Sequence, residues 1–347
     1  MRMLVVGGTT GTATIPGISA AGASAPLRAH TPSADFEVVS FGSPIQAPIL
    51  PVSPSGCPTP AVVTRAVRDL VSFECDCVDA GLATPTASPT IELGPFAESA
   101  DQSGWTPEPG KDVREAVAVP DAAHYFKAGK RFARGLQDDR LAIGETIPGG
   151  TTTALAVLSA LGESPTVSSS LPENPLGRKR AVATEALAAS DLKPGELAGK
   201  PVEAVRLVGD TVLGTIAGMI VGAREAGVEI LLAGGTQLAA AGALARHAGV
   251  TASLTLATTT FVERDESADI EGLAAALDID LVVTDPEFER VDHPAMNAYV
   301  AGEGKEGVGM GGALAIAAEE DVPMAAVRSQ VIARYAAIRE GEPAVKP

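Results

Sequence analysis

The chain alternates short apolar runs with Ala- and Leu-rich segments, and this alternation limits its fold more than any other feature. Each apolar run ends in polar or Gly-rich sequence, and most are followed by a segment with helical spacing. Strands that alternate with helices are typical of βα units and a parallel sheet. We therefore expect a Rossmann-like α/β fold, a mostly parallel sheet flanked by helices. The expected strands are residues 3–6, 36–39, 141–143, 228–232, 253–257 and 279–283. The expected helices are residues 60–72, 152–161, 180–189, 212–226, 237–247, 270–277 and 323–339.

The length and composition suit one large domain with a small addition. Aromatic residues make up 3% of the 347 residues, so small aliphatic side chains must form the core. We expect an α/β domain at residues 1–320 and a small C-terminal helical appendage at 321–347. The Pro- and Gly-rich stretches at 44–60 and 84–110 read as ordered loops or lids over a site.

The charge and the apolar runs exclude several partners. A formal net charge of −17 disfavours nucleic acid, because binding a polyanion depends on clustered Lys and Arg. The longest apolar helical stretch, residues 211–223, is shorter than the roughly 18 residues that a membrane span needs. We expect a cytoplasmic protein without a membrane partner, and the acidic excess predicts a salt-loving host.

The three cysteines are expected to be reduced thiols. Cys57, Cys75 and Cys77 leave one thiol without a partner, and no secretory signal accompanies them. They could supply three metal ligands, yet a structural zinc site usually has four at CxxC-like spacings. We therefore predict no metal site and no cofactor.

Four Gly-rich turns repeat one arrangement, in which glycines stand just before an Ala-rich helix. Bare backbone lets a ligand approach, and a helix N-terminus presents free N–H groups to an anion. In a parallel sheet such turns gather along the carboxyl edge. The turns lie at 7–11, 149–153, 234–236 and 307–312. The candidate binding residues are Gly149, Gly150, Thr151, Thr152, Gly234, Gly235, Gly307 and Gly309.

Three other interpretations of these turns stay open at this stage. Each glycine could serve only close strand-to-helix packing. The turn at 7–11 could instead bind a dinucleotide in an NAD-dependent oxidoreductase, although it lacks the G-x-G-x-x-G spacing and Pro16 follows soon after. A non-catalytic nucleotide-binding protein would keep the turns and need no base.

Two glutamates stand next to the turns. Glu145 lies four residues before Gly149, and Glu306 directly precedes Gly307. A partly desolvated carboxylate beside phosphate-binding turns can act as a general base, because burial raises its pKa towards the working pH. A capping or solvated role is the alternative for either residue.

In order along the chain, these segments resemble the nicotinate-nucleotide:dimethylbenzimidazole phosphoribosyltransferase family of cobamide synthesis, especially its archaeal branch. The Ile-Gly-Glu-Thr-Ile-Pro-Gly-Gly-Thr-Thr stretch at 143–152 is similar to the bacterial Ile-Gly-Glu-Met-Gly-Ile-Gly-Asn-Thr-Thr. Further similar segments lie at 171–179, 208–219 and 231–235, and the segment at 305–313 resembles the one that carries the family's catalytic glutamate. The series spans about half of the chain.

The resemblance implies a reaction and roles for the candidates. The family transfers a phosphoribosyl group from nicotinate mononucleotide to a benzimidazole-type base, and it assembles as a homodimer. Glu306 matches the catalytic base, and Glu145 would steady positive charge on the sugar. The 149–152 turn and Lys179 would hold the 5′-phosphate. Glu303 stands where the bacterial sequence has Arg, and the bacterial benzimidazole-pocket segment has no counterpart other than the stretch at 44–60.

Overall fold

The strands form one parallel sheet. The computed structural model describes all 347 residues except 20–24, 49–52, 54, 98–103 and 341–347. Within the described residues the strand order is β3-β2-β1-β4-β5-β6-β7, with every pair parallel. The strands are β1 (Arg2–Gly7), β2 (Glu74–Asp79), β3 (Thr90–Glu92), β4 (Arg140–Thr146), β5 (Glu229–Ala233), β6 (Thr255–Thr259) and β7 (Asp280–Thr284). The predicted α/β class with a parallel sheet is confirmed.

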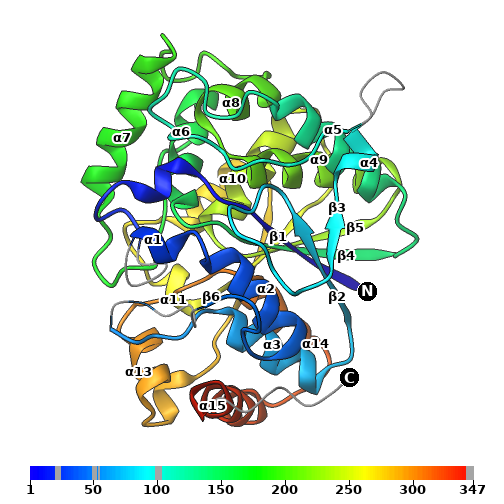
Figure 1. The fold of residues 1–347 in the computed structure, drawn as a ribbon, viewed down its shortest axis with the longest axis vertical. Helices are drawn as coiled ribbons and strands as arrows, with labels where there is room; N and C mark the ends of the chain where they lie inside the picture. The colour runs from blue at the N-terminus through cyan, green and yellow to red at the C-terminus, as the bar shows by residue number, and fades with distance from the viewer. Residues whose placement is uncertain (20–24, 49–52, 54, 98–103, 341–347) are drawn as a thin grey trace.

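Helices cover both faces of this sheet (Figure 1). One face carries α5 (Ala122–Arg134), α6 (Gly150–Leu161), α7 (Leu176–Ala189), α8 (Pro201–Val208), α9 (Thr211–Glu225), α10 (Thr236–His247) and α12 (Ile270–Ala276). The other carries α2 (Thr31–Phe41), α3 (Ala61–Leu70), α13 (Pro294–Val300), α14 (Met310–Glu319) and α15 (Met324–Glu340). Shorter elements are α1 (Ala25–Arg28), α4 (Gly94–Ala97), α11 (Thr260–Glu263), η1 (Gly11–Thr14) and η2 (Phe288–Arg290).

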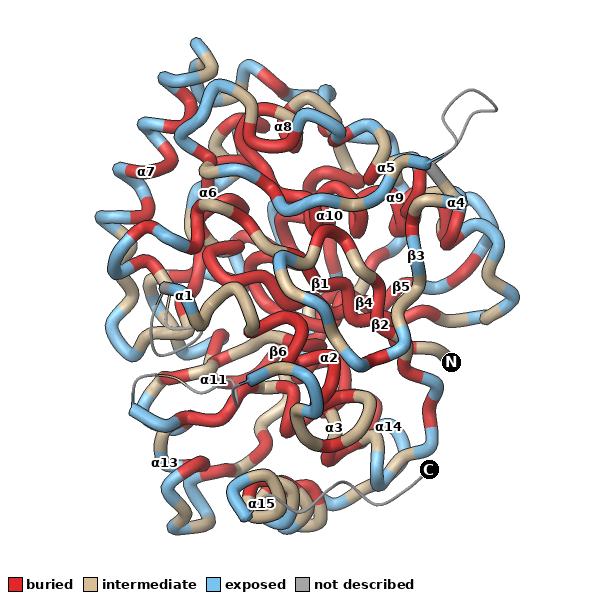
Figure 2. Tube along the Cα trace, viewed as in Figure 1, coloured by how far each residue is buried: buried red, intermediate tan, exposed pale blue. Residues whose placement is uncertain are grey.

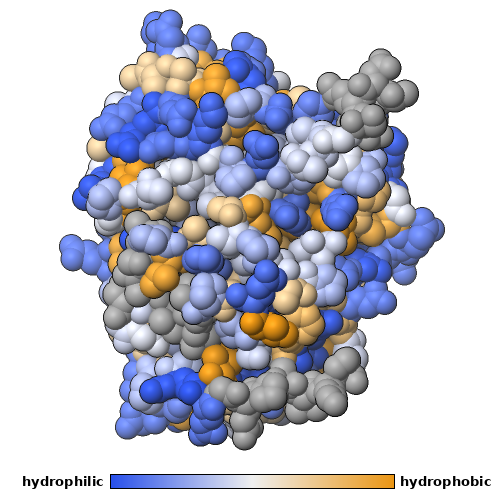
Figure 3. All heavy atoms as spheres, viewed as in Figure 1, coloured by the Kyte–Doolittle hydropathy of each residue, from blue (hydrophilic) through white to orange (hydrophobic). Residues whose placement is uncertain are grey.

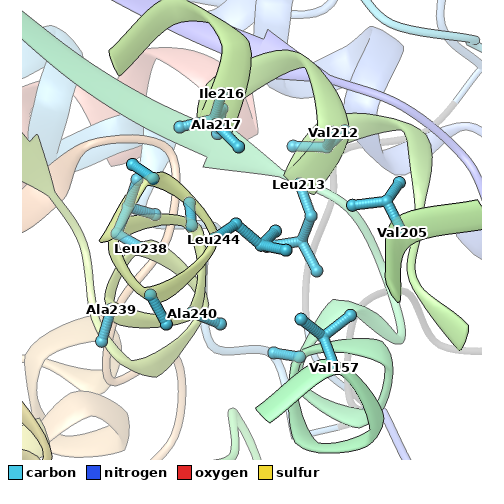
Figure 4. Close-up of a cluster of buried hydrophobic side chains, with 14 of the residues drawn as sticks. Val157, Val205, Val212, Leu213, Ile216, Ala217, Leu238, Ala239, Ala240 and Leu244 are labelled. Carbon is cyan, nitrogen blue, oxygen red and sulfur yellow. The ribbon is translucent and has the colours of Figure 1, made fainter. Parts of the chain in front are cut away.

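Alternation along the strands divides the core into two layers. On β1, Leu4 and Val6 belong to the cluster under α5–α10, whereas Met3 and Val5 belong to the cluster under α2, α3 and α14. Both sets are fully buried, which is why the strand reads as one continuous apolar run. Buried segments accordingly fill the centre of the trace in Figure 2. Figure 4 shows small aliphatic side chains of α6, α8, α9 and α10 that gather in the first cluster.

One predicted strand is wrong. Residues 36–39 lie inside α2, where Phe36, Val38 and Val39 are buried. The helix is covered on nearly all sides, so its apolar residues form a run and lack amphipathic spacing. A short apolar run cannot distinguish a buried helix from a buried strand. The strand next to β1 is instead β2, whose sequence ECDCVD was not recognised as a strand.

The C-terminal segment and the two Pro-rich stretches pack onto the domain. In α15, Val327 and Val331 join the core cluster that contains α3. The stretch at 84–110 contains β3 and α4, and its Trp105 ring packs edge-on against Tyr125 at 4.9 Å. Residues 49–52, 54 and 98–103 of these stretches lie outside the described residues. A domain boundary at residue 320 stays a prediction.

The described surface and thiols show neither a membrane span nor a metal centre. Within the described ranges no helix combines the length and apolar character that crossing a bilayer requires. The face drawn in Figure 3 is mostly hydrophilic, with apolar residues scattered over it. Cys57, Cys75 and Cys77 are buried free thiols, and burial raises their pKa values to about 12, 12 and 11. In this part of the chain no group of three or more His, Cys, Asp or Glu side chains is placed to bind a metal ion.

Candidate active site

A pocket lies at the carboxyl edge of the sheet, next to the point where the strand order reverses. The chain crosses from β1 to β2 on one side, and β4 lies on the other side of β1. Ligands of open α/β sheets bind at such a switch point. The pocket encloses about 990 Å³ including its open mouth. Its walls come mainly from residues 57–60, 145–151, 168–170, 235–237 and 304–308.

Seven of the predicted site residues line this pocket. They are Glu145, Glu306, Gly149, Gly150, Thr151, Gly235 and Gly307. The remaining four lie behind its walls: Thr152 and Lys179 are fully buried, Gly234 packs on Leu238, and Gly309 packs on Gly144 and Met3. The three turns at 149–153, 234–236 and 307–312 therefore meet at one site.

The turn at 7–11 is not part of the pocket wall. A Cβ added at Gly7 would lie 2.4 Å from the Phe36 ring, and one at Gly11 would lie 2.6 Å from the backbone nitrogen of Asp112. These glycines serve close packing against neighbouring segments. The pocket described here therefore gives the dinucleotide interpretation no support.

The Glu306 side chain lines the pocket, and backbone N–H groups hold one of its two carboxylate oxygens. Its Oε1 accepts the backbone N–H groups of Gly307 at 3.1 Å and Gly311 at 2.9 Å, at the N-terminus of α14. Its Oε2 is buried and forms no hydrogen bond of normal geometry among the described residues, although the Thr258 hydroxyl lies near this carboxylate. The side chain borders the open pocket and keeps some solvent contact. Burial raises the pKa of Glu306 to about 8, although the two backbone N–H groups and the Thr258 hydroxyl oppose this shift.

A left-handed stretch of backbone holds Glu306 in place. Gly307, Val308 and Gly309 have φ values of 139°, 54° and 77°, and a positive φ is costly for a β-branched residue such as Val308. Two hydrogen bonds hold Val308: its N–H donates to the Glu145 carbonyl at 2.7 Å, and its carbonyl accepts from Thr64 Oγ1 at 2.8 Å. The Glu306 loop is thus fastened directly to the end of β4.

Close backbone contact between β4 and this loop depends on a glycine. A Cβ added at Gly144 would lie 2.6 Å from the Gly309 backbone. Glycine at 144 therefore lets the loop approach the strand, and this approach brings Glu145 and Glu306 to the same pocket.

Glu145 is 7% exposed and lies among other carboxylates. Burial, together with the negative charges of Asp210, Glu306 and Asp35, raises its pKa to about 8. Asp210 caps α9 through the Leu213 N–H and accepts from Thr153, and burial raises its pKa to about 6. Within the described part of the chain, no Lys, Arg or His forms an ion pair with these carboxylates. The cluster therefore favours a cationic or proton-donating ligand.

Asp35 was not predicted as a site residue. It lies on α2, is 2% exposed and lines the pocket. Its carboxylate accepts the hydroxyls of Thr59 and Thr146, each at 2.6 Å. Burial raises its pKa to about 7, and the two hydroxyls oppose that shift. The only sequence signal was a charged residue within an apolar run, which the strand interpretation of 36–39 obscured.

The opposite part of the wall supplies donors for an anion. Gly149 has φ 85° and begins α6, whose N-terminus faces the pocket. A Cβ at Gly150 would lie 1.9 Å from Gln237 Nε2, so a larger residue there would have to displace the Gln237 side chain. Thr151 projects from the first turn of α6. Phosphate binding by this turn stays a prediction.

Lys179 supports that part of the wall from behind. The side chain is fully buried on α7, and Nζ donates to Thr151 Oγ1 at 2.9 Å and to the Ser168 carbonyl at 2.7 Å. Desolvation lowers its pKa to about 7, although the negative charge of Asp265 opposes that shift. Because the ammonium donates to Thr151 Oγ1, the Thr151 hydroxyl proton is free to donate elsewhere.

A second lysine, Lys305, lines the pocket, and the sequence alone gave it no role. Its Nζ pairs with Asp265 Oδ2 at 2.7 Å, and both side chains are less than a tenth exposed. Ser168 Oγ donates to the same oxygen at 3.1 Å. Ser169, Ser170 and Gln237 also line this wall. No motif distinguished them in the sequence, because isolated Ser and Gln residues have no diagnostic spacing.

The carboxylate cluster predicts a stability that falls between about pH 5 and 8. In the unfolded chain, glutamates ionise near 4.5, whereas folded Glu145 and Glu306 hold their protons until about pH 8. The folded state thus binds more protons over this interval, so the free energy of unfolding falls as pH rises. Lys179 has the opposite effect from pH 7 upward, because its folded pKa of about 7 lies below the unfolded 10.5.

The variant Glu145→Gln tests whether ionised Glu145 lowers the stability of the folded protein. At pH 8 we expect a melting temperature about 2 °C above wild type, which corresponds to a relief of about 1 kcal/mol of repulsion. At about pH 5 the two proteins should unfold together, because folded Glu145 is then protonated. Thermal unfolding followed by circular dichroism at both pH values is the measurement. A lower melting temperature for the variant at pH 8 would contradict the idea that neighbouring carboxylates repel Glu145.

The chain matches a known family over most of its length. The family model DBI_PRT, described as phosphoribosyltransferase, matches residues 71–287. A UPF0284 protein of Halobacterium salinarum is 57% identical over 94% of this chain and 95% of its own. A UPF0284 protein of Methanosarcina acetivorans is 38% identical over 94% of this chain and 92% of its own.

Solved structures share the fold. CobT from Thermus thermophilus superposes with a TM-score of 0.59 at 19% identity, over 96% of this chain and 83% of its own. The nicotinate-nucleotide-dimethylbenzimidazole phosphoribosyltransferase from the same organism gives a TM-score of 0.58 at 19% identity, over 96% and 82%. The resemblance noted in the sequence is confirmed: this chain belongs to the DBI_PRT phosphoribosyltransferase family and has a CobT-like fold.

Proposed function

We propose that this protein transfers the phosphoribosyl group of nicotinate mononucleotide to a benzimidazole-type base and releases nicotinate. The product would be an α-ribazole phosphate, the nucleotide of a cobamide lower ligand. The observation that carries the proposal is that Glu306 and Glu145 line one pocket with raised pKa values and, among the described residues, without a paired cation. Family membership supports the reaction class.

The two parts of the pocket wall suit the two ends of this substrate. The N-terminus of α6, the Thr151 hydroxyl and Lys305 favour the dianionic 5′-phosphate. The carboxylates favour the cationic pyridinium and the positive charge that develops on the ribose. Nicotinate mononucleotide carries a 5′-phosphate and a pyridinium on one ribose, so one substrate suits both parts of the wall.

One base is sufficient for the reaction. A ring nitrogen of the acceptor attacks the anomeric carbon with its lone pair from the face opposite the pyridinium, which inverts that centre. The bond to nicotinate breaks, and its electron pair neutralises the pyridinium, so the leaving group needs no acid. Glu306 takes the N–H proton from the other ring nitrogen. Glu145 stabilises the sugar cation during the transfer.

The pKa values set the expected pH profile. A base must be unprotonated, and burial raises the pKa of Glu306 to about 8. The rate should therefore rise with pH through about 8 and level above it. Bound substrate moves this midpoint downward, because the pyridinium favours the ionised carboxylate.

Base-dependent release of nicotinate is the test. The protein is incubated with nicotinate mononucleotide, with and without dimethylbenzimidazole, and nicotinate is followed by chromatography. We expect release only when the base is present. Absence of turnover with every benzimidazole and purine tried would refute the proposal, and reduction of a nicotinamide cofactor would favour an oxidoreductase instead. Assembly as a homodimer stays a prediction.

A further inference from the structure

The acceptor side of the pocket has a wall of its own, formed by residues 57–60. This wall faces the loop that carries Glu306. A Cβ at Gly304 would lie 3.4 Å from Cys57 Sγ, and one at Gly307 would lie 3.6 Å from Pro60 Cγ. These contacts pack the wall directly against the loop, and residues 57–60 line the same pocket as Glu306, so an acceptor whose N–H reaches Glu306 lies next to them.

Several contacts hold this wall in place from both sides. The Tyr299 hydroxyl donates to the Pro58 carbonyl at 2.8 Å. Ser53 Oγ donates to Glu303 Oε2 at 2.5 Å, and Ser55 Oγ donates to the same oxygen. Glu303, which replaces the bacterial Arg, thus fastens the segment that precedes the wall to the Glu306 loop. These hydrogen bonds fix the position of the wall relative to Glu306.

The wall has one polar feature. Cys57, Pro58 and Pro60 present apolar groups, and burial keeps the Cys57 thiol protonated by raising its pKa to about 12. Thr59 donates its hydroxyl proton to Asp35, and its oxygen also accepts the Ala61 N–H at 3.2 Å. From the described residues the Asp35 carboxylate accepts two hydroxyls, although a carboxylate offers about four lone-pair sites. When Asp35 is ionised, the pair therefore presents acceptor oxygens and no free donor; because burial raises the pKa of Asp35 to about 7, the binding measurements below are made at pH 8.

We propose that Asp35 and Thr59 form a specificity element that selects acceptor bases bearing an N–H or O–H donor on the ring edge away from the reacting nitrogens. This inference rests on the proposed function, because it needs an aromatic acceptor in this pocket. A donor on that edge satisfies the remaining lone pairs of the buried carboxylate. An alkyl group there displaces water from Asp35 but donates no hydrogen bond to it, which costs binding free energy.

Two acceptors of nearly equal shape test the element: 5-hydroxybenzimidazole and 5-methylbenzimidazole. Their Kd values are measured by isothermal titration calorimetry, a readout that needs no turnover. We expect wild type to bind the hydroxyl compound about tenfold more tightly, or about 1.4 kcal/mol. Asp35→Asn and Thr59→Val should each bring this ratio to within about threefold of one. Asp121→Asn, an exposed position just before α5, is the matched control and should keep the wild-type ratio.

The outcomes separate this inference from the proposed function. Equal or tighter binding of the methyl compound by wild type would overturn it, as would an unchanged ratio in both variants. Thr59→Val removes no charge, so it decides the question if Asp35→Asn does not fold. Nicotinate release is measured separately in the wild type, and its absence would refute the proposed reaction without altering the Kd ratio.

Discussion

Replacing Glu306 with Gln is expected to lower kcat by about 10²–10⁴-fold, the usual contribution of a general base. Gln keeps the size of the side chain and an oxygen for the Gly307 and Gly311 N–H groups, but it cannot take the acceptor's proton. We expect the Kd for nicotinate mononucleotide to change by less than about threefold, since the phosphate contacts remain. Steady-state kinetics and calorimetric titration provide the two numbers.

Glu320→Gln provides the matched control for this change. Glu320 is exposed at the end of α14, away from the pocket, so its substitution should leave kcat unchanged. Near-wild-type turnover by Glu306→Gln would remove Glu306 as the base. A joint loss of turnover and melting temperature would instead assign the residue to the folding of the loop.

The second large effect is expected at Lys179. Lys179→Met retains an unbranched apolar side chain but loses both Nζ hydrogen bonds, to Thr151 Oγ1 and to the Ser168 carbonyl. The Thr151 hydroxyl is then free to turn away from the pocket, and a positive charge near the phosphate is lost. We expect the Kd for nicotinate mononucleotide to rise about 10–100-fold. Stability should change less, because burying an ammonium is itself costly.

Nicotinate riboside, which lacks the phosphate, shows whether Lys179 acts on the phosphate or supports the pocket as a whole. Its Kd should be nearly the same in wild type and Lys179→Met, measured by the same titration. Lys193→Met, on the exposed segment after α7, is the control and should bind both compounds normally. An equal loss of affinity for both compounds would show that Lys179 supports the pocket as a whole.

Much of the fold followed from local pattern, and the errors have a common cause. The runs at 3–6, 141–143 and 228–232 became central strands because strands covered on both faces contain few polar residues. Residues 36–39 show the same apolar density inside a helix, so composition could not separate the two. The strand β2 was missed for the opposite reason, because its sequence is too polar to form an apolar run.

The candidate site was predictable where residues stand beside glycine turns. Glu145 and Glu306 precede turns that parallel strands bring to one edge, and both line the pocket. Asp35 and Asp265 come from segments without such turns. Their placement depends on how α2 and the segment after α11 pack on the sheet, and no spacing in the sequence encodes that.

The proposed reaction is tested most directly by its second product. After incubation with nicotinate mononucleotide and a benzimidazole, mass spectrometry and NMR identify the nucleotide and the configuration of its anomeric carbon. We predict one α-riboside 5′-phosphate, joined through a ring nitrogen, for each nicotinate released. Nicotinate accompanied by free ribose 5-phosphate, with no nucleotide formed, would contradict transfer and show hydrolysis instead.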